Sequence, residues 1–187
     1  MSDEPTVSSR LVFRGQVATV RVDEVRLPSG RIGRREIIEH PGAAAIVALT
    51  DASEVVLVRQ YRKTVERTLL EIPAGKLEPG ESPLACAQRE LAEETGLQAD
   101  EMTPLVTFVP SPGILTEAIT VFLARGLAPH RVSAPVDEEG LRVERVPLEH
   151  IHGLIAAGEI LDGKSLVGLL LTLSGRARNE PARGGAS

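Results

Sequence analysis

The chain has 187 residues, a formal net charge of −5, and only three Phe, one Tyr and no Trp. This composition excludes the basic groove with stacking aromatic residues that nucleic-acid binding requires. No run of residues approaches the roughly 18 apolar residues of a membrane span. The single cysteine, Cys86, excludes an internal disulfide and a cysteine-based zinc site. Because Met-Ser-Asp-Glu-Pro lacks the regions of a signal peptide, we expect a cytoplasmic protein that acts on a small anion, without nucleic-acid or membrane partners.

The first 40 residues are predicted to form an antiparallel β-hairpin. Residues 10–27 and 31–39 carry β-branched side chains in alternation, and the segment Pro28-Ser29-Gly30 between them has the composition of a turn. The apolar runs that follow are joined by polar residues and predict a second hairpin and a strand leading to Gly75. These strands are expected at residues 43–49, 55–59 and 69–72.

Residues 83–95 carry the signals of a helix. Ser82 is a good N-cap, Pro83 suits the first helical position, and Gly96 is a plausible C-cap. One apolar stripe of this helix is expected to face the core, and the glutamates are expected on the neighbouring stripe, away from it. The core-facing stripe consists of Leu84, Ala87, Leu91 and Thr95.

Three glutamates crowd onto the second half of this helix. Glu90 and Glu94 are i,i+4 neighbours, and Glu93 lies close to them on the same side. Like charges at this spacing destabilise a helix by about a few tenths of a kcal/mol per pair, so something must offset them. Clustered carboxylate oxygens suit Mg2+ or Mn2+, ions that in turn suit phosphate substrates. Taken alone, an acidic solvated face is the more common explanation, but the surrounding residues favour a metal site.

Beyond the helix, apolar segments predict three more strands and then two helices. The strands are expected at residues 105–109, 119–124 and 142–146, and the helices at residues 148–157 and 163–174. Strands, one helix, further strands and two closing helices indicate an α+β fold with a mixed sheet between helices.

Residues 75–97 fit the Nudix box, GX5EX7REUXEEXGU with U aliphatic, at every defined position. The defined positions hold Gly75, Glu81, Arg89, Glu90, Leu91, Glu93, Glu94, Gly96 and Leu97. The chain therefore resembles the Nudix hydrolases, which use divalent metal to cut a diphosphate linked to another moiety. The resemblance implies a Nudix-type α/β/α sandwich with a mixed sheet. We expect an N-terminal, dimerising strand extension over residues 1–40, a catalytic domain over 41–175 and a flexible tail over 176–187.

Three stretches outside the box resemble the ADP-ribose pyrophosphatase subgroup. Residues 58–62 have the form VRQ-x-R, and residues 70–75 read LEIPAG. Pro112 lies sixteen residues after Gly96, a spacing that marks this subgroup. The resemblance makes Ser111, Pro112 and Gly113, followed by Glu117, a substrate loop. It also implies a homodimer in which two subunits exchange their N-terminal strands.

The resemblance assigns roles to the residues of the box. Glu90 and Glu94 are implied as the main metal ligands, with Glu93 as a third, direct or through water, and the Ala74 carbonyl as a further ligand. Two or more Mg2+ ions are expected in each site, with Mn2+ as a substitute. Arg89 is expected to pair with Glu81 and hold the loop on the helix rather than to bind phosphate.

Phosphate binding and water activation require residues beyond the box. Arg62 is the first choice for neutralising the substrate phosphates, and Arg59 is the weaker choice. The acidic loop at residues 136–140 occupies the place of the subgroup's general base, where Glu139 aligns best. Glu138 and Glu93 remain alternatives, because Gly140 departs from the acidic or apolar residues that relatives more often carry there.

The sequence thus predicts metal-dependent hydrolysis of ADP-ribose to AMP and ribose 5-phosphate. Another nucleoside diphosphate sugar is the nearest alternative, since the sugar pocket is not legible from the sequence. A domain that senses nucleotide sugars without cutting them is the other alternative. Such domains commonly lose box carboxylates or carry a DNA-binding module, whereas this chain keeps Glu90, Glu93 and Glu94.

Overall fold

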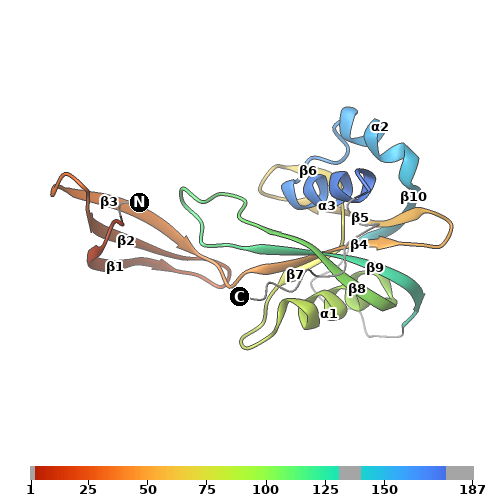
Figure 1. The fold of residues 1–187 in the computed structure, drawn as a ribbon, viewed down its shortest axis with the longest axis horizontal. Coiled ribbons are helices and arrows are strands. Elements are labelled where there is room, and N and C mark those ends of the chain that lie inside the picture. Colours follow the sequence, from red (N-terminus) through yellow and green to blue (C-terminus); the bar gives the residue numbers. More distant parts are fainter. Residues whose placement is uncertain (1–2, 131–139, 176–187) are drawn as a thin grey trace, which may run out of the picture. The chain divides into compact units, whose positions relative to one another are not determined.

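The structure is a computed structural model that describes residues 3–130 and 140–175 (Figure 1). Two compact units make up the chain. The first comprises Met1–Gly42 with Val109–Ala118, and the second comprises Ala43–Phe108 with Ile119–Ser187. Within the described residues, no helix is long and apolar enough to cross a membrane.

The first unit contains a three-stranded antiparallel sheet in the order β1-β2-β3. The predicted hairpin is confirmed as β2 and β3, whose turn is closed by a hydrogen bond from Gly30 N to Leu27 O of 2.8 Å. Its first arm, however, divides into two strands, because the chain reverses at Gly15, whose N–H donates to Ala18 O at 2.9 Å. The strands are β1 (Thr6–Arg14), β2 (Thr19–Arg26) and β3 (Ile32–Glu39).

The second unit is built on a mixed sheet in the order β10-β5-β4-β9-β8, with β6 paired to β5 and β7 paired to β4. Strands β4 and β9 are parallel, and the other pairs are antiparallel. The bounds are β4 (Ala43–Leu49), β5 (Glu54–Arg62), β6 (Arg67–Glu71), β7 (Ala74–Lys76), β8 (Leu97–Phe108), β9 (Ile119–Pro129) and β10 (Arg142–Pro147). The predicted mixed sheet is confirmed.

Helices cover both faces of this sheet (Figure 1). Alternate residues of β4 point to opposite faces, as the period of a strand requires. Ile46 belongs to the cluster that contains Leu91 of α1, while Val47 belongs to the cluster that contains Leu169 of α3. The predicted α/β/α sandwich is therefore confirmed. Its helices are α1 (Pro83–Thr95), α2 (Ile151–Ala156), preceded by the 3-10 turn η2 (Leu148–His150), and α3 (Gly163–Leu173).

Candidate active site

The helix α1 begins and ends where the sequence predicts. The Ser82 side chain accepts a hydrogen bond from Ala85 N at 3.2 Å, and Pro83 occupies the first turn. Gly96 ends the helix with φ of 68°, a left-handed conformation that glycine adopts at low cost. These local signals place the three glutamates at known positions on one rigid helix.

The buried face of α1 differs from the predicted stripe. Ala87 and Leu91 are buried as expected, but Leu84 is 42% exposed. Glu90 and Glu94 are only 8% and 9% exposed, so neighbouring parts of the protein cover them, which the apolar stripe does not predict. Two carboxylates buried on one helix face need positive or hydrogen-bonding partners, because desolvation disfavours their charged forms.

Arg89 supplies part of this compensation. One of its terminal nitrogens, Nη1, donates to Glu90 Oε1 at 2.7 Å and to Glu93 Oε2 at 3.0 Å. Its Nε and Nη2 atoms donate to the two oxygens of Glu81, each at 2.9 Å. The predicted pair of Arg89 with Glu81 is thus present as a two-pronged contact. The arginine joins the loop before α1 to the helix itself.

The charges around Arg89 shift the protonation of its partners. Hydrogen bonds from Arg89 lower the pKa of Glu81 from 4.5 to about 2. Burial raises the pKa of Glu90, and the contact with Arg89 opposes that rise. Burial also raises the pKa of the Cys86 thiol to about 12, which favours the neutral form of a thiol packed in the core.

The backbone of β7 lies directly against the buried glutamates. Ala74 N–H donates to Glu94 Oε2 at 3.0 Å. A Cβ atom added to Gly75 would lie 1.7 Å from Glu90 Oε1, so a larger residue here would displace the Glu90 carboxylate or the backbone. The chain therefore brings together Ala74, Gly75, Glu90 and Glu94, which lie up to twenty residues apart in the sequence.

The donor set of this region fits a hard divalent cation. Glu90, Glu93 and Glu94 offer carboxylate oxygens, and the backbone carbonyl of Ala74 is a further oxygen of the kind that Mg2+ prefers. Within residues 3–130 and 140–175, no three acidic, His or Cys side chains are already grouped so that they could hold a metal ion. Instead, Arg89 Nη1 lies within hydrogen-bond distance of both Glu90 and Glu93.

The two arginines predicted to bind phosphate lie on β5, and both are engaged in ion pairs. Arg62 donates from Nε and Nη2 to the two oxygens of Glu71, each at 2.8 Å. Arg59 donates to Glu144 at 2.5 and 3.1 Å and to Glu159 at 3.0 Å. Arg59 is therefore held by two carboxylates and Arg62 by one.

The predicted substrate loop belongs to the first unit, as does Glu117. The segment that contains Ser111, Pro112 and Gly113 ends in a turn in which Ser111 O accepts from Leu115 N at 2.9 Å. Glu117 Oε1 lies 3.3 Å from His40 Nδ1. The predicted base Glu139 and its alternative Glu138 lie outside the described residues.

The sequence-based prediction missed the surroundings of Glu71. This carboxylate is 2% exposed and contacts Lys164 as well as Arg62. The available signal was weak: Glu71 falls within the LEIPAG stretch, but nothing in the sequence connects it to Lys164, 93 residues away.

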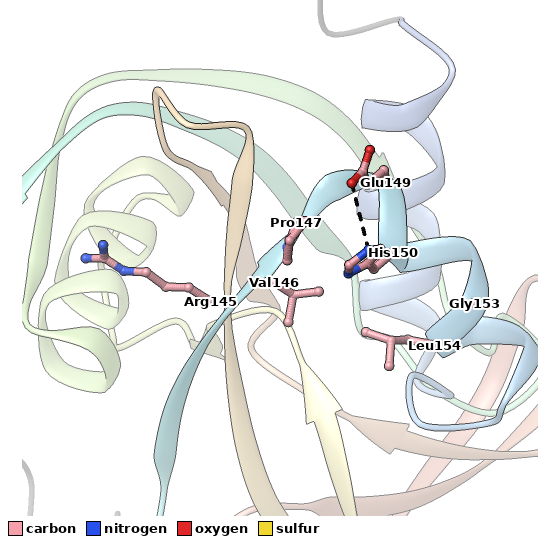
Figure 2. A pocket seen from close by; sticks show the side chains of 7 residues that line it. All are labelled: Arg145, Val146, Pro147, Glu149, His150, Gly153 and Leu154. Carbon is pink, nitrogen blue, oxygen red and sulfur yellow. Dashed lines mark ion pairs between the residues drawn. The ribbon is translucent and has the colours of Figure 1, made fainter.

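A pocket of about 590 Å3 elsewhere on the second unit contains none of the predicted site residues (Figure 2). Its lining comes from β10, η2 and α2, with Val146 and Leu154 among its apolar residues. His150 also lines the pocket; its side chain is exposed and lies 3.8 Å from Glu149. This pocket shares no lining residue with the carboxylate cluster on α1.

Comparison with known families agrees with the box and the fold. The family model described as NUDIX domain matches residues 39–166. A second model, described as Nucleoside diphosphate sugar hydrolase N-terminal domain, matches residues 4–38. The fold and the carboxylate helix thus define a protein of the Nudix class.

Individual relatives cover nearly the whole chain. The ADP-ribose pyrophosphatase of Bacillus subtilis (strain 168) is 43% identical over 164 residues, which are 87% of this chain and 89% of that protein. The methanol dehydrogenase activator of Bacillus methanolicus is 40% identical over 88% of this chain and 90% of its own. A crystal structure of an ADP compounds hydrolase superimposes with a TM-score of 0.84 at 25% identity, covering 96% of this chain and 98% of that one. The chain belongs to the Nudix family and is a Nudix hydrolase.

Proposed function

We propose that this Nudix hydrolase cleaves ADP-ribose to AMP and ribose 5-phosphate. A water oxygen bonds to one phosphorus, the bond from that phosphorus to the bridging oxygen breaks, and the bridging oxygen leaves on the other phosphate. The observation that carries the reaction class is the pair of buried carboxylates, Glu90 and Glu94, packed against the Ala74 and Gly75 backbone. The similarity to the Bacillus subtilis ADP-ribose pyrophosphatase supports the choice of substrate.

Mg2+ is the proposed cofactor, with Mn2+ as a substitute. Glu90, Glu93, Glu94 and the Ala74 carbonyl would hold two or more ions. When bound, such ions lower the pKa of a water molecule and neutralise diphosphate charge. Arg89 holds the loop before α1 and the carboxylates in place rather than binding phosphate, because its guanidinium donates hydrogen bonds to Glu81, Glu90 and Glu93.

The remaining roles fall to residues outside the box. Arg62 binds a phosphate oxygen, and Arg59 is the weaker choice because Glu144 and Glu159 both hold it. The loop with Ser111, Pro112 and Gly113, together with Glu117, contacts the substrate.

The base that removes the proton from the attacking water is Glu139, with Glu138 and Glu93 as alternatives. Glu139→Gln is expected to lower kcat by about 100-fold or more, the scale of general base catalysis, and to leave substrate affinity unchanged. Single-turnover rates and equilibrium binding of ADP-ribose would separate the two effects. A normal rate in Glu139→Gln would move the base to Glu138 or Glu93.

We further propose that the protein is a homodimer joined through the N-terminal strands. All nine residues of β1 are exposed within one chain, among them Leu11 at 50% and Phe13 at 58%. Exposed apolar rows of this kind are typical of protein interfaces. A second copy of the chain is the proposed occupant.

A product assay tests the proposed reaction. Purified protein with Mg2+ is offered ADP-ribose, GDP-mannose, UDP-glucose, a diadenosine polyphosphate and dNTPs, and AMP is measured by chromatography. Faster release of AMP from ADP-ribose than reaction of the others, and its loss on adding EDTA, is the expected result. Binding of nucleotides without cleavage would instead identify a sensing domain.

A second candidate substrate is another nucleoside diphosphate sugar. The match of residues 4–38 to the nucleoside diphosphate sugar hydrolase N-terminal domain favours it, because that model does not specify the nucleotide or the sugar. Preferential cleavage of GDP-mannose or UDP-glucose in the same assay would replace ADP-ribose while leaving the diphosphate chemistry intact.

A further inference from the structure

An ion-pair network surrounds the buried carboxylate of Glu71, at the end of β6. Glu71 is the last residue of this strand and is 2% exposed. Its Oε1 accepts from Arg62 Nε and its Oε2 accepts from Arg62 Nη2, each at 2.8 Å. Lys164 Nζ donates to the same Oε2 from the first turn of α3. Both oxygens of Glu71 are therefore occupied by cationic donors.

The first turn of α3 fixes this network from the other side. Lys164 Nζ also donates to Asp162 Oδ2 at 2.9 Å, and Asp162 caps the helix by accepting from Ser165 N at 3.1 Å. The Ser165 hydroxyl in turn accepts from Ile72 N at 2.9 Å. The chain segments that carry Glu71 and Lys164 are thus tied to each other by backbone as well as side-chain contacts.

The network holds its charges at neutral pH. Burial on its own raises the pKa of Glu71, but the hydrogen bonds from Arg62 and the charge and hydrogen bond of Lys164 lower it to about 2. Two positive and two negative groups, Arg62 and Lys164 against Glu71 and Asp162, balance each other. A buried ionic group of this kind is seldom more stable than apolar residues of similar volume. Its presence is better explained by orientation of a functional group than by stability.

Arg62 is the most exposed member of the network. Its side chain is 38% exposed, whereas that of Glu71 is 2% exposed. A guanidinium has five N–H donors in a rigid fork, and hydrogen bonds to Glu71 use two of them, which leaves three without a hydrogen-bond partner among residues 3–130 and 140–175. The charge of Glu94, on the carboxylate face of α1, also contributes to raising the pKa of Arg62. The guanidinium of Arg62 therefore lies within the electrostatic field of Glu94.

We propose that Glu71 and Lys164 are positioning residues, which hold the Arg62 guanidinium so that its free N–H groups meet a diphosphate oxygen. This inference rests on the proposed function, because it presumes that Arg62 binds the diphosphate. Glu71 sets the plane of the guanidinium through two parallel hydrogen bonds, and Lys164 fixes Glu71. An arginine without this support would lose rotamer freedom on binding each substrate, which weakens binding.

The test is a double-mutant cycle on the full chain with Mg2+. Glu71→Gln combined with Lys164→Met removes one negative and one positive charge, so it leaves the balance of the network unchanged. This pair of substitutions is compared with Arg62→Ala and with all three together, by measuring kcat and KM for ADP-ribose. Glu66→Gln, which breaks an exposed contact with Lys63 near the end of β5, serves as the control. Thermal unfolding verifies that each variant is folded.

The expected result is a rise in KM of about tenfold in the paired variant, since one charged hydrogen bond is worth roughly that factor. The triple variant should be no worse than Arg62→Ala alone, because all these residues act through one guanidinium. Effects that multiply independently, or a fall in kcat alone, would overturn the positioning role.

A second readout does not require activity. The 15N resonance of Arg62 Nε–H, assigned by its loss in Arg62→Lys, should be sharp and slow to exchange in the wild type and broadened in the paired variant. An unchanged resonance in a folded paired variant would overturn the inference. Failure of the wild type to cleave ADP-ribose would refute the proposed substrate, and the resonance would still decide whether Glu71 orders Arg62.

Discussion

The two units of the chain differ in where their apolar side chains go. In the second unit, all seven residues of β4 are buried, and they contribute to both clusters of the core. In the first unit, all nine residues of β1 are exposed, although Leu11, Val12 and Phe13 follow one another there. The second unit buries the side chains of its central strand within one chain, whereas the first unit leaves apolar side chains of β1 exposed.

This difference suggests separate roles for the two units, catalysis in the second and association in the first. The second unit carries the buried carboxylates that we propose as metal ligands, and ligands need a rigid mounting. The first unit presents the surface that the proposed dimer would cover. The comparison predicts that changes in the second unit affect chemistry or stability, and that changes on β1 affect association.

The largest expected effect is the loss of turnover in Glu94→Gln. Loss of a residue that only supports a metal ligand costs about 10–100-fold, so loss of a ligand itself should cost about 100-fold or more. The amide keeps the size of the side chain, and the fold should persist in circular dichroism. Glu78→Gln, at an exposed position in the loop before α1, is the control and should retain the wild-type rate. Normal turnover in Glu94→Gln would remove Glu94 from the metal site.

The next effect concerns the first unit. Leu11→Lys together with Phe13→Lys should raise the dissociation constant of the dimer by at least about 100-fold, since burying each of the two apolar side chains contributes roughly 1.5–3 kcal/mol. Sedimentation equilibrium measures the constant, with Arg14→Lys on the same strand as a charge-preserving control. A wild-type protein that sediments as a monomer at every concentration would refute the dimer.

A smaller effect is expected from Gly75→Ala. The added Cβ would lie 1.7 Å from Glu90 Oε1, so the carboxylate or the backbone must move. Overpacking of this kind lowers the free energy of unfolding by about 1–3 kcal/mol, and the displaced Glu90 should also weaken Mg2+ binding. Denaturant unfolding is the measurement. Gly153→Ala, where nothing lies within 4 Å of an added Cβ, is the matched control and should not lower stability.

The sequence predicted the elements that depend on local signals. Ser82, Pro83 and Gly96 act through their own backbone geometry, so both ends of α1 were correct. The reversal at Gly15 was missed because residues 10–27 were treated as one strand, although no β-branched residue lies between Val12 and Val17. The first residues of β8 were missed because Asp100 and Glu101 are poor strand formers, and they are held by pairing with β9.

The site was predictable in its residue types and less so in its contacts. The box pattern identifies the glutamates. The pairing of Arg89 on α1 with Glu81 in the loop before it was predicted from their opposite charges. Burial of Glu90 and Glu94 was not predicted, because helical periodicity reports which face is apolar and not which polar residues a neighbouring loop covers. Contact of Glu71 with Lys164 depends on the packing of α3 against the sheet at β4 and β9, which no local signal encodes.

The smallest expected effect is a pH dependence of stability that originates at Glu81. Arg89 lowers the pKa of Glu81 in the folded protein to about 2, against an ordinary value of 4.5. As the pH falls below about 4.5, the unfolded chain takes up a proton at this residue while the folded protein does not, so stability decreases until about pH 2. Glu81→Gln removes this contribution and should flatten the acid limb of a plot of unfolding free energy against pH. Part of the slope should remain, because Glu71 has a similarly lowered pKa. Glu78→Gln should keep the wild-type slope, and an identical slope in Glu81→Gln would mean that the pair with Arg89 does not form in solution.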